Sequence, residues 1–135
     1  MKYTDKKIDH FRREYLAGEL MEKDMLADPY FQLMEWLEDA LRSGVNDPTA
    51  MALATSDPSG RPSLRMVLLK DARPEGLVFF TAYNSRKGRE LDANPHASVM
   101  FYWSGLDRQL RVEGNVKKVS TMESDDFFAS RPLKS

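Results

Sequence analysis

The chain has 135 residues, of which 20 are basic and 21 acidic, so its formal net charge is −1. A chain of this length is expected to form one domain, and a charge near zero provides no overall field that would attract nucleic acid or an anionic membrane. Because the chain contains no cysteine, disulfides, thiolate catalysis and zinc–thiolate sites are excluded. The two histidines, His10 and His96, lie far apart, so we expect no metal site. The sequence has neither an apolar leader nor a run of membrane-spanning length, which predicts a soluble cytoplasmic protein.

Helical patterns occupy the first third of the chain. Apolar residues at helical spacing predict a short amphipathic helix within residues 1–20, followed by a linker at residues 21–27. A second helix is predicted to begin at Pro29, because Asp28 suits the capping position and proline suits the first helical position. Gly44 is predicted to end this helix.

From residue 50 onward the pattern is mainly that of β-strands. The first three predicted strands follow one another through short turns, which indicates an antiparallel meander. Several antiparallel strands in a small chain indicate a sheet that curls into a barrel. Gly114, inside the last strand, indicates a bulge or a close approach of two backbones. The predicted strands are residues 50–55, 63–71, 77–82, 97–103 and 108–119.

Two further helices are predicted among or after the strands. Ser85 suits the capping position of a short helix that Asn94-Pro95 would stop. Ser120-Thr121-Met122-Glu123 fits the capping-box pattern and predicts a last helix, which Arg131-Pro132 would end.

The strand at 63–71 contains the run Arg65-Met66-Val67-Leu68-Leu69-Lys70, which is apolar in the middle and cationic at both ends. Four consecutive apolar residues predict a strand that is covered on both faces. Such a strand leaves two alternatives for Arg65 and Lys70. Their charged ends extend to solvent, or each of them meets an anion or another partner.

A second cationic spot lies at the start of the short helix that follows Ser85. The N-terminus of a helix carries a partial positive charge and favours Asp or Glu, but this helix begins with Arg86 and Lys87. A bound phosphate would make the arrangement favourable, because the helix amides and both cations would face one anion. The alternative is that both side chains extend into water. If the strand and the helix start meet, Arg65, Arg86 and Lys87 form a phosphate site.

The sequence contains neither the G-x-x-x-x-G-K-[ST] loop nor G-x-G-x-x-G, and its residues offer no Ser-His-Asp or Cys-His set. If the protein is an enzyme, a phosphate-bearing organic cofactor is expected to supply the chemistry. An alternative is a small barrel that binds single-stranded nucleic acid, although the near-neutral charge argues against it. The residues available for that alternative are Arg108, Arg111, Lys117 and Lys118 with Phe101, Tyr102 and Trp103.

Six short motifs occur in order along the chain: Arg12-Arg13-Glu14-Tyr15, Asp47-Pro48-Thr49-Ala50-Met51, Arg65 to Lys70, Ser85-Arg86-Lys87, Arg108-Gln109 and Ser130-Arg131-Pro132. With these motifs the chain resembles the pyridoxine/pyridoxamine 5′-phosphate oxidase family over nearly all of its length. The resemblance implies a mainly β protein with flanking helices, an FMN-binding split β-barrel. Residues 1–27 would form a helical arm or lid, and residues 28–135 the FMN-binding domain.

The resemblance also implies an activity and an assembly. The activity is FMN-dependent oxidation of pyridoxamine or pyridoxine 5′-phosphate to pyridoxal 5′-phosphate, with oxygen reduced to hydrogen peroxide. The assembly is a homodimer that holds FMN between its subunits. No nucleic acid or membrane partner is implied.

Family residues carry over to matching positions of this sequence, with Arg86 and Lys87 on the FMN phosphate and Gln109 reaching the flavin from the partner subunit. No residue is assigned a certain catalytic role. The implied cofactor-binding residues are Arg65, Met66, Val67, Leu68, Leu69, Lys70, Phe80, Thr81, Arg86, Lys87 and Gln109. The implied substrate-binding residues are Arg12, Arg13, Glu14, Tyr15, Lys70, Arg131 and Ser135.

The chain departs from the family pattern at two places. Phe127 stands where the family commonly has a tyrosine for the substrate phosphate, and the sequence ends at Ser135, where family members continue with further strands and flavin-contacting residues. We therefore expect part of the FMN site to be missing from this chain. A non-catalytic protein that binds FMN or pyridoxal phosphate is the alternative to an oxidase.

Overall fold

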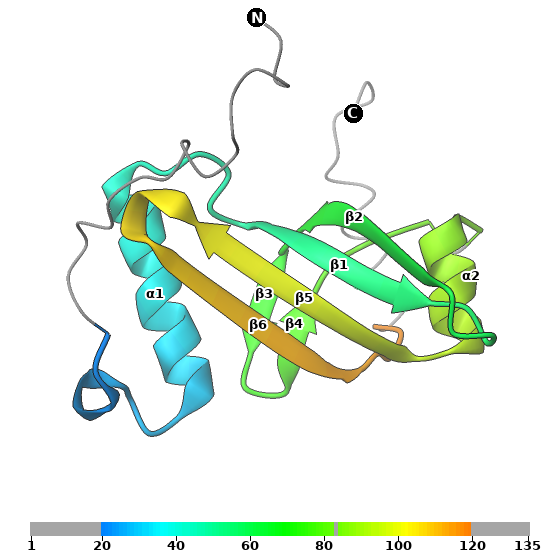
Figure 1. Ribbon diagram of the computed structural model, residues 1–135, viewed down its shortest axis with the longest axis horizontal. Helices are drawn as coiled ribbons and strands as arrows, with labels where there is room; N and C mark the ends of the chain where they lie inside the picture. The colour runs from blue at the N-terminus through cyan, green and yellow to red at the C-terminus, as the bar shows by residue number, and fades with distance from the viewer. Residues whose placement is uncertain (1–19, 83, 120–135) are drawn as a thin grey trace, which may run out of the picture.

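The computed structural model describes residues 20–82 and 84–119. This part of the chain contains two α-helices and six strands, and the strands form two antiparallel sheets (Figure 1). The prediction of a mainly β protein with flanking helices is therefore confirmed. The helices predicted within residues 1–20 and after Ser120 lie outside the described residues, as do Arg12, Arg13, Glu14, Tyr15, Phe127, Arg131 and Ser135.

The larger sheet has four strands in the order β2-β1-β5-β6, and all of its neighbouring strands are antiparallel. Strands β1 and β2 form the predicted hairpin, with Leu53 opposite Arg65. The smaller sheet pairs β3 with β4. The strand bounds are Ala50–Ser56 (β1), Pro62–Leu68 (β2), Asp71–Arg73 (β3), Gly76–Val78 (β4), His96–Trp103 (β5) and Arg108–Asn115 (β6).

The helices begin and end where local signals predict. Helix α1 spans Pro29–Ser43, the Asp28 side chain accepts a hydrogen bond from the backbone of Tyr30 at 2.9 Å, and Gly44 ends the helix at a φ of 76°. That positive φ is a conformation that glycine adopts without steric cost. Helix α2 spans Arg86–Ala93. The two helices lie at opposite ends of the larger sheet (Figure 1). In the predicted linker at 21–27 there is one short 3₁₀ helix, η3 (Glu22–Asp24).

The core lies between α1 and one face of the larger sheet, which we call the inner face. Strand alternation points every second side chain to this face. Met51, Leu53 and Phe101 are fully buried there, and the indole of Trp103 donates a hydrogen bond to the Pro48 carbonyl at 2.8 Å. The helix contributes Leu33, Trp36, Leu37 and Ala40 to the same cluster.

The run from Arg65 to Lys70 is not one continuous strand. Its backbone changes partners after Leu68, because Leu69 N–H donates to the Thr49 carbonyl at 2.9 Å, whereas Lys70 N–H donates to the Val78 carbonyl at 2.8 Å. The predicted strand at 63–71 therefore divides into β2 and β3. Strand β4 pairs with β3 rather than with β2 and ends at Val78, so the predicted meander and the predicted strand at 77–82 are wrong in these details.

The last strand is also shorter than predicted. Strand β6 ends at Asn115, although Val116 N–H still donates to the Pro95 carbonyl at 2.7 Å. Gly114 lies in regular register opposite Ala97, and a Cβ placed on it would meet no heavy atom within 4 Å. The bulge or close approach predicted at Gly114 is therefore wrong.

The prediction that the apolar run is covered on both faces is wrong for a single chain. β2 is an edge strand, and Leu64, Met66 and Leu68 on its second face are 71%, 62% and 50% exposed. We call this second face of the larger sheet the outer face. It also carries Tyr102, which is 55% exposed. In the described part of the chain both helices leave this apolar surface uncovered, and none of the helices is long and apolar enough to cross a membrane.

Two leucines of α1 give a matched test of this core. Leu37 is 8% exposed and Leu41 is 56% exposed. We expect Leu37→Ala to lower the free energy of unfolding by about 2–5 kcal/mol, because it opens a cavity among packed side chains. Leu41→Ala is expected to change it by less than about 1 kcal/mol. Urea unfolding of both variants measures the difference, and equal losses would contradict the assignment of the buried face.

Candidate functional site

An open pocket of about 460 Å³ lies where β2 meets the N-terminus of α2. The strand and the helix start do meet, as the predicted phosphate site requires. The pocket gathers four cationic side chains in a protein of net charge −1. Its lining residues are Arg61, Pro62, Ser63, Leu64, Arg65, Ser85, Arg86 and Lys87.

The start of α2 is fixed by its capping residue. The Ser85 hydroxyl accepts a hydrogen bond from Gly88 N–H at 3.1 Å and donates one to the Ala82 carbonyl at 2.6 Å. This cap places Arg86 and Lys87 in the first turn, beside N–H groups that point toward the pocket end of the helix. An anion at this end would meet the helix N-terminus and both cations together.

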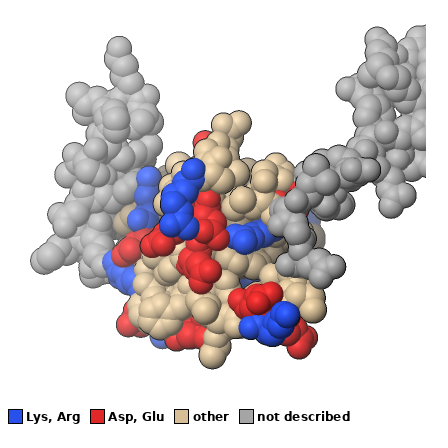
Figure 2. Space-filling model, turned by 90° about the vertical axis from the view of Figure 1, so that its left-hand side faces the viewer, with Lys and Arg blue, Asp and Glu red and all other residues tan. Residues whose placement is uncertain are grey.

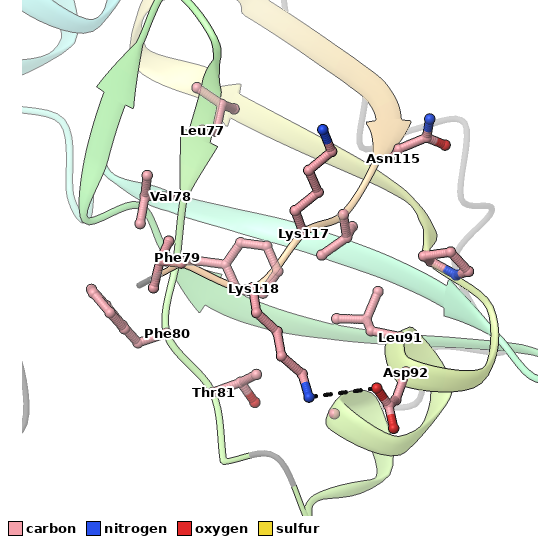
Figure 3. A pocket seen from close by; sticks show the side chains of 14 residues that line it. Leu77, Val78, Phe79, Phe80, Thr81, Leu91, Asp92, Asn115, Lys117 and Lys118 are labelled. Carbon is pink, nitrogen blue, oxygen red and sulfur yellow. Dashed lines mark ion pairs between the residues drawn. The ribbon is translucent and has the colours of Figure 1, made fainter. Parts of the chain in front are cut away.

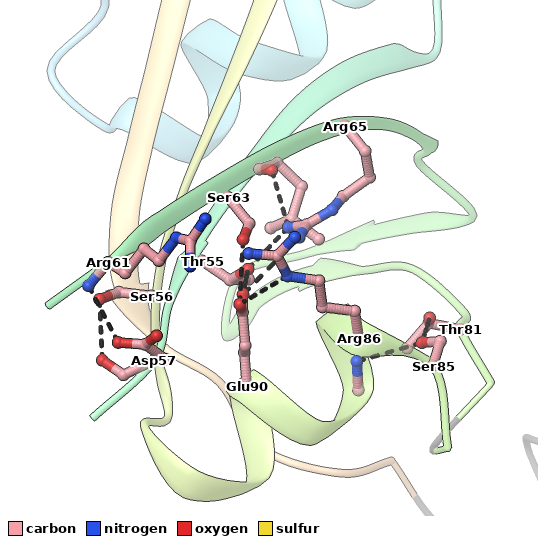
Figure 4. A network of polar contacts seen from close by, with 12 residues as sticks. Thr55, Ser56, Asp57, Arg61, Ser63, Arg65, Thr81, Ser85, Arg86 and Glu90 are labelled. Carbon is pink, nitrogen blue, oxygen red and sulfur yellow. Dashed lines mark hydrogen bonds and ion pairs between the residues drawn. The ribbon is translucent and has the colours of Figure 1, made fainter. Parts of the chain in front are cut away.

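One carboxylate, that of Glu90, lies behind the pocket and joins its two walls (Figure 4). Glu90 Oε1 is 3.2 Å from Arg86 Nε, and Glu90 Oε2 is 3.7 Å from Arg65 Nη2. The hydroxyl of Ser63 donates to Oε1 at 2.9 Å, and that of Thr55 donates to Oε2 at 2.5 Å. Glu90 is only 7% exposed. Each of the two guanidinium groups, on Arg65 and on Arg86, already pairs with a carboxylate of the protein. Neither of the two predicted alternatives, free extension into water or contact with a bound anion only, therefore describes them.

Arg65 is held on its other side by the first strand. Its Nη1 donates to the Leu53 carbonyl at 3.1 Å and to the Thr55 hydroxyl at 2.7 Å. Thr55 thus accepts from Arg65 and donates to Glu90. This chain of hydrogen bonds connects β1, β2 and α2 and leaves no buried side-chain polar atom unpaired among the described residues.

Hydrogen bonding keeps the pKa of Glu90 below its ordinary value. The bond from Thr55 is the main cause, those from Ser63 and Arg86 act in the same direction, and burial acts against them. The carboxylate is therefore ionised at neutral pH. Its spacing of four residues from Arg86 is a signal for an ion pair that the sequence contains, whereas the contacts with Thr55 and Ser63 depend on the tertiary fold.

The remaining residues of the predicted stretch lie on both faces of the larger sheet or beyond it. Val67 shares the inner face with Arg65, whereas Met66 and Leu68 lie on the outer face. Leu69 is buried and Lys70 is exposed, and Lys70 lines neither this pocket nor the cavity described next.

Phe80 and Thr81 lie in a second cavity of about 550 Å³, between β4, α2 and the segment that follows β6 (Figure 3). An ion pair of 3.6 Å between Lys118 and Asp92 crosses this cavity. The two cavities come close at Ser85, whose hydroxyl oxygen is 3.4 Å from that of Thr81. Of the predicted cofactor residues, Arg65, Arg86 and Lys87 thus line one cavity, and Phe80 and Thr81 line its neighbour.

Gln109 lies apart from both cavities. It is exposed on β6, where it pairs with Tyr102 on the outer face. The order β2-β1-β5-β6 places β6 at the opposite edge of the sheet from β2. Within one chain, Gln109 and Arg65 therefore lie on different faces and different edges.

The chain matches a family model described as pyridoxamine 5′-phosphate oxidase over residues 37–135. It is 49% identical over 131 residues to the pyridoxine/pyridoxamine 5′-phosphate oxidase of a Nostoc species, a match that covers 97% of this chain and 61% of the relative. The chain therefore spans about three-fifths of the length of this relative.

Two solved structures show the likeness in fold. PhzG from Burkholderia lata, crystallised with tetrahydrophenazine-1-carboxylic acid, is 32% identical with a TM-score of 0.79, over 84% of this chain and 57% of PhzG. A pyridoxamine 5′-phosphate oxidase-related, FMN-binding protein from Nostoc punctiforme is 22% identical with a TM-score of 0.57, over 77% of this chain and 56% of its own. The predicted fold class, an FMN-binding split barrel, is confirmed by these comparisons.

The ionised state of Glu90 gives a pH test. A carboxyl whose pKa is lowered by folding stabilises the protein above its ordinary pKa, about 4.3, and this contribution is lost as the pH falls through the lower, folded-state value. Glu90→Gln is therefore expected to flatten the loss of unfolding free energy between about pH 5 and pH 3. Urea unfolding across this range measures it. The exposed Glu35→Gln is the control, and an identical flattening in both variants would contradict the assignment.

Proposed function

The chain belongs to the pyridoxamine 5′-phosphate oxidase family, and on that premise we propose that it binds FMN and serves to oxidise pyridoxamine or pyridoxine 5′-phosphate to pyridoxal 5′-phosphate, with oxygen reduced to hydrogen peroxide. When bound, FMN supplies the flavin that accepts the hydride. The observation that carries the proposal is the convergence of Arg65, Arg86 and Lys87 on one pocket at a capped helix N-terminus.

The residues of this pocket fit a phosphate group. Cationic side chains surround an opening at which helix N–H groups also point, and both features favour an anion. Glu90, the carboxylate that pairs with Arg65 and Arg86, is buried and does not line the pocket. A phosphate dianion entering from solvent would therefore meet cations before it met this carboxylate.

A homodimer is the second part of the proposal, and Gln109 supports it. If Gln109 contacts the flavin, it must do so in another copy, because in its own chain it lies on the opposite face and edge of the sheet from Arg65. The outer face also carries exposed Leu64, Met66 and Leu68. A patch of this kind marks an interaction surface, and a second copy packed on it would bring the two parts of each site together.

The substrate side of the site rests on the family alone. Arg12 to Tyr15, Arg131 and Ser135 lie outside the described residues, and Lys70 is exposed at the junction of β2 and β3. Their contacts with a B6 phosphate stay predictions, as does the cytoplasmic location. A non-catalytic FMN or pyridoxal-phosphate binder is the second candidate, because the pocket of the described residues accounts for phosphate binding alone.

The nucleic-acid alternative loses its main support in the structure. Two of its three aromatic residues, Phe101 and Trp103, are buried in the core, so their rings are closed to base stacking. Arg108 donates to Asp39 at 2.8 Å, and its guanidinium lies 4.8 Å from the ring centre of Trp36. Figure 2 shows acidic and basic side chains interspersed over the face around α1 rather than a continuous basic stripe.

Removing two pocket charges tests the phosphate assignment. Arg86→Gln/Lys87→Gln is expected to weaken FMN binding by about 100-fold or more, because a hydrogen bond to a charged group is worth about 1.5–3 kcal/mol. Titration of flavin fluorescence measures the dissociation constant. The control variant Lys23→Gln/Arg42→Gln also removes two positive charges, but at positions in η3 and α1 away from the pocket. It should leave the dissociation constant of FMN unchanged.

Unchanged FMN affinity in the pocket variant would remove the phosphate assignment. Adding pyridoxamine 5′-phosphate to the FMN-loaded wild-type chain in air then separates the two candidate functions. Release of hydrogen peroxide supports the oxidase, and FMN binding without peroxide supports the non-catalytic binder.

The dimer is tested on the outer face. Met66→Glu places a charge in the apolar patch and is expected to convert the dimer into a monomer that retains its far-UV circular dichroism. Sedimentation velocity measures the change in mass. Phe31→Glu, at a position on α1 that is 58% exposed, is the control and should remain dimeric. A wild-type chain that is monomeric with FMN bound would contradict the proposal.

A further inference from the structure

The position of Glu90 needs a physical reason, because the negative charge of a carboxylate beside an anion site opposes anion binding. It lies behind the pocket and contacts two of the four cations that line it. A phosphate bound to those cations would be repelled by Glu90 at short range. If Glu90 contributes to phosphate binding, it must do so through what it does to Arg65 and Arg86.

The contacts of Glu90 fix the orientation of Arg86. A guanidinium group has five N–H donors in a rigid plane. Arg86 uses Nε to reach Glu90 Oε1 at 3.2 Å. Within residues 20–82 and 84–119 its two Nη groups make no hydrogen bond, so one edge of the plane is anchored and the other is available at the pocket.

Arg65 is fixed by the same network from the other wall. Its Nη2 is 3.7 Å from Glu90 Oε2, while its Nη1 is held by the Leu53 carbonyl and by Thr55. Long cationic side chains lose many rotamers when they bind a ligand, and a side chain already held in its binding rotamer loses fewer. Glu90 is the one group in the described part of the chain that contacts both arginines through its side-chain oxygens.

We propose that Glu90 is a positioning residue of the anion pocket. It presents Arg86 to a phosphate through a direct hydrogen bond, and Arg65 through the Thr55 hydroxyl that bonds to both, rather than through its charge. This inference rests on the proposed FMN phosphate site. Glutamine has the shape that such a role needs. Its Oε1 keeps the acceptor for Ser63 and Arg86. The Thr55 hydroxyl accepts from Arg65 with one lone pair and can accept from the new amide group with the other.

The experiment compares two ligands and two substitutions. Riboflavin has the flavin ring and lacks the phosphate, so it reports on the rest of the site. For Glu90→Ala we expect the dissociation constant of FMN to rise by about tenfold or more, and that of riboflavin to change by less than about twofold. For Glu90→Gln, the conservative rescue, we expect the FMN constant to stay within about threefold of the wild type or to fall, because the repulsive charge is gone.

Three outcomes would overturn the inference. An equal loss of FMN affinity in the Gln and Ala variants would assign the role to charge. An equal loss of FMN and riboflavin affinity in the Ala variant would assign Glu90 a merely structural role. Unchanged FMN affinity in the Ala variant would leave it no role at the pocket.

A double-mutant cycle separates a positioning role from a general structural effect of Glu90→Ala, and the conservative Glu90→Gln variant gives a reading of its own if Glu90→Ala is unstable. In an Arg65→Gln/Arg86→Gln background, a positioning residue has nothing left to position, so adding Glu90→Ala should cost no further FMN affinity. A further loss there would contradict the inference. Failure of the proposed function itself is visible separately, because a wild-type chain that binds FMN no more tightly than riboflavin has no phosphate site.

Discussion

The contacts of Glu90 join α2 to the β1–β2 hairpin, and the geometry of the candidate site depends on this junction. Two cations in the first turn of a helix are unfavourable, because they add to the positive end of the helix dipole. Glu90 offsets this one turn later by pairing with Arg86 and, across the gap, with Arg65. The carboxylate is buried, whereas the cations reach the surface. Glu90 therefore neutralises the arginines on their buried side, and their solvent-facing side can still attract an anion.

The larger sheet imposes a second constraint, since its two faces alternate along every strand. The inner face closes on α1 and forms the core, whereas the outer face keeps Leu64, Met66 and Leu68 in solvent in the single chain. The stretch from Arg65 to Leu68 therefore serves two surfaces, with its basic residue toward the pocket and apolar residues toward the proposed partner. This explains how the strand can carry exposed apolar residues on its outer face and yet lie at the edge of its sheet.

Features fixed by local chemistry could be predicted from the sequence. Asp28, Gly44 and Ser85 act on backbone groups within a few residues, so the start and end of α1 and the start of α2 were predictable. The break between β2 and β3 was not, because it depends on the distant carbonyls of Thr49 and Val78. A continuous apolar run looks the same in sequence whether its side chains are buried by their own chain or by a partner. The exposure of β2 in the single chain therefore could not be predicted from it.

The candidate site follows the same division between local signals, which could be predicted, and tertiary contacts, which could not. The cations at 65, 86 and 87 stood out because each is unfavourable without a partner, but their meeting depended on the fold. Glu90 was missed although it lies four residues after Arg86, since an acidic residue on a short helix usually faces solvent. Arg61 was missed because a basic residue beside a turn carries no signal of its own; only the hairpin brings it to the pocket.

Local charge within a neutral protein also bears on what the pocket selects. Charges farther apart than about 8 Å are largely screened at physiological salt. A polyanion such as nucleic acid samples the whole surface, where acidic residues slightly outnumber basic ones, and gains little from four cations in one spot. A small anion that enters the pocket samples only those cations and the helix N-terminus. The charge distribution of this chain therefore favours a ligand with a single compact phosphate and disfavours an extended phosphate backbone.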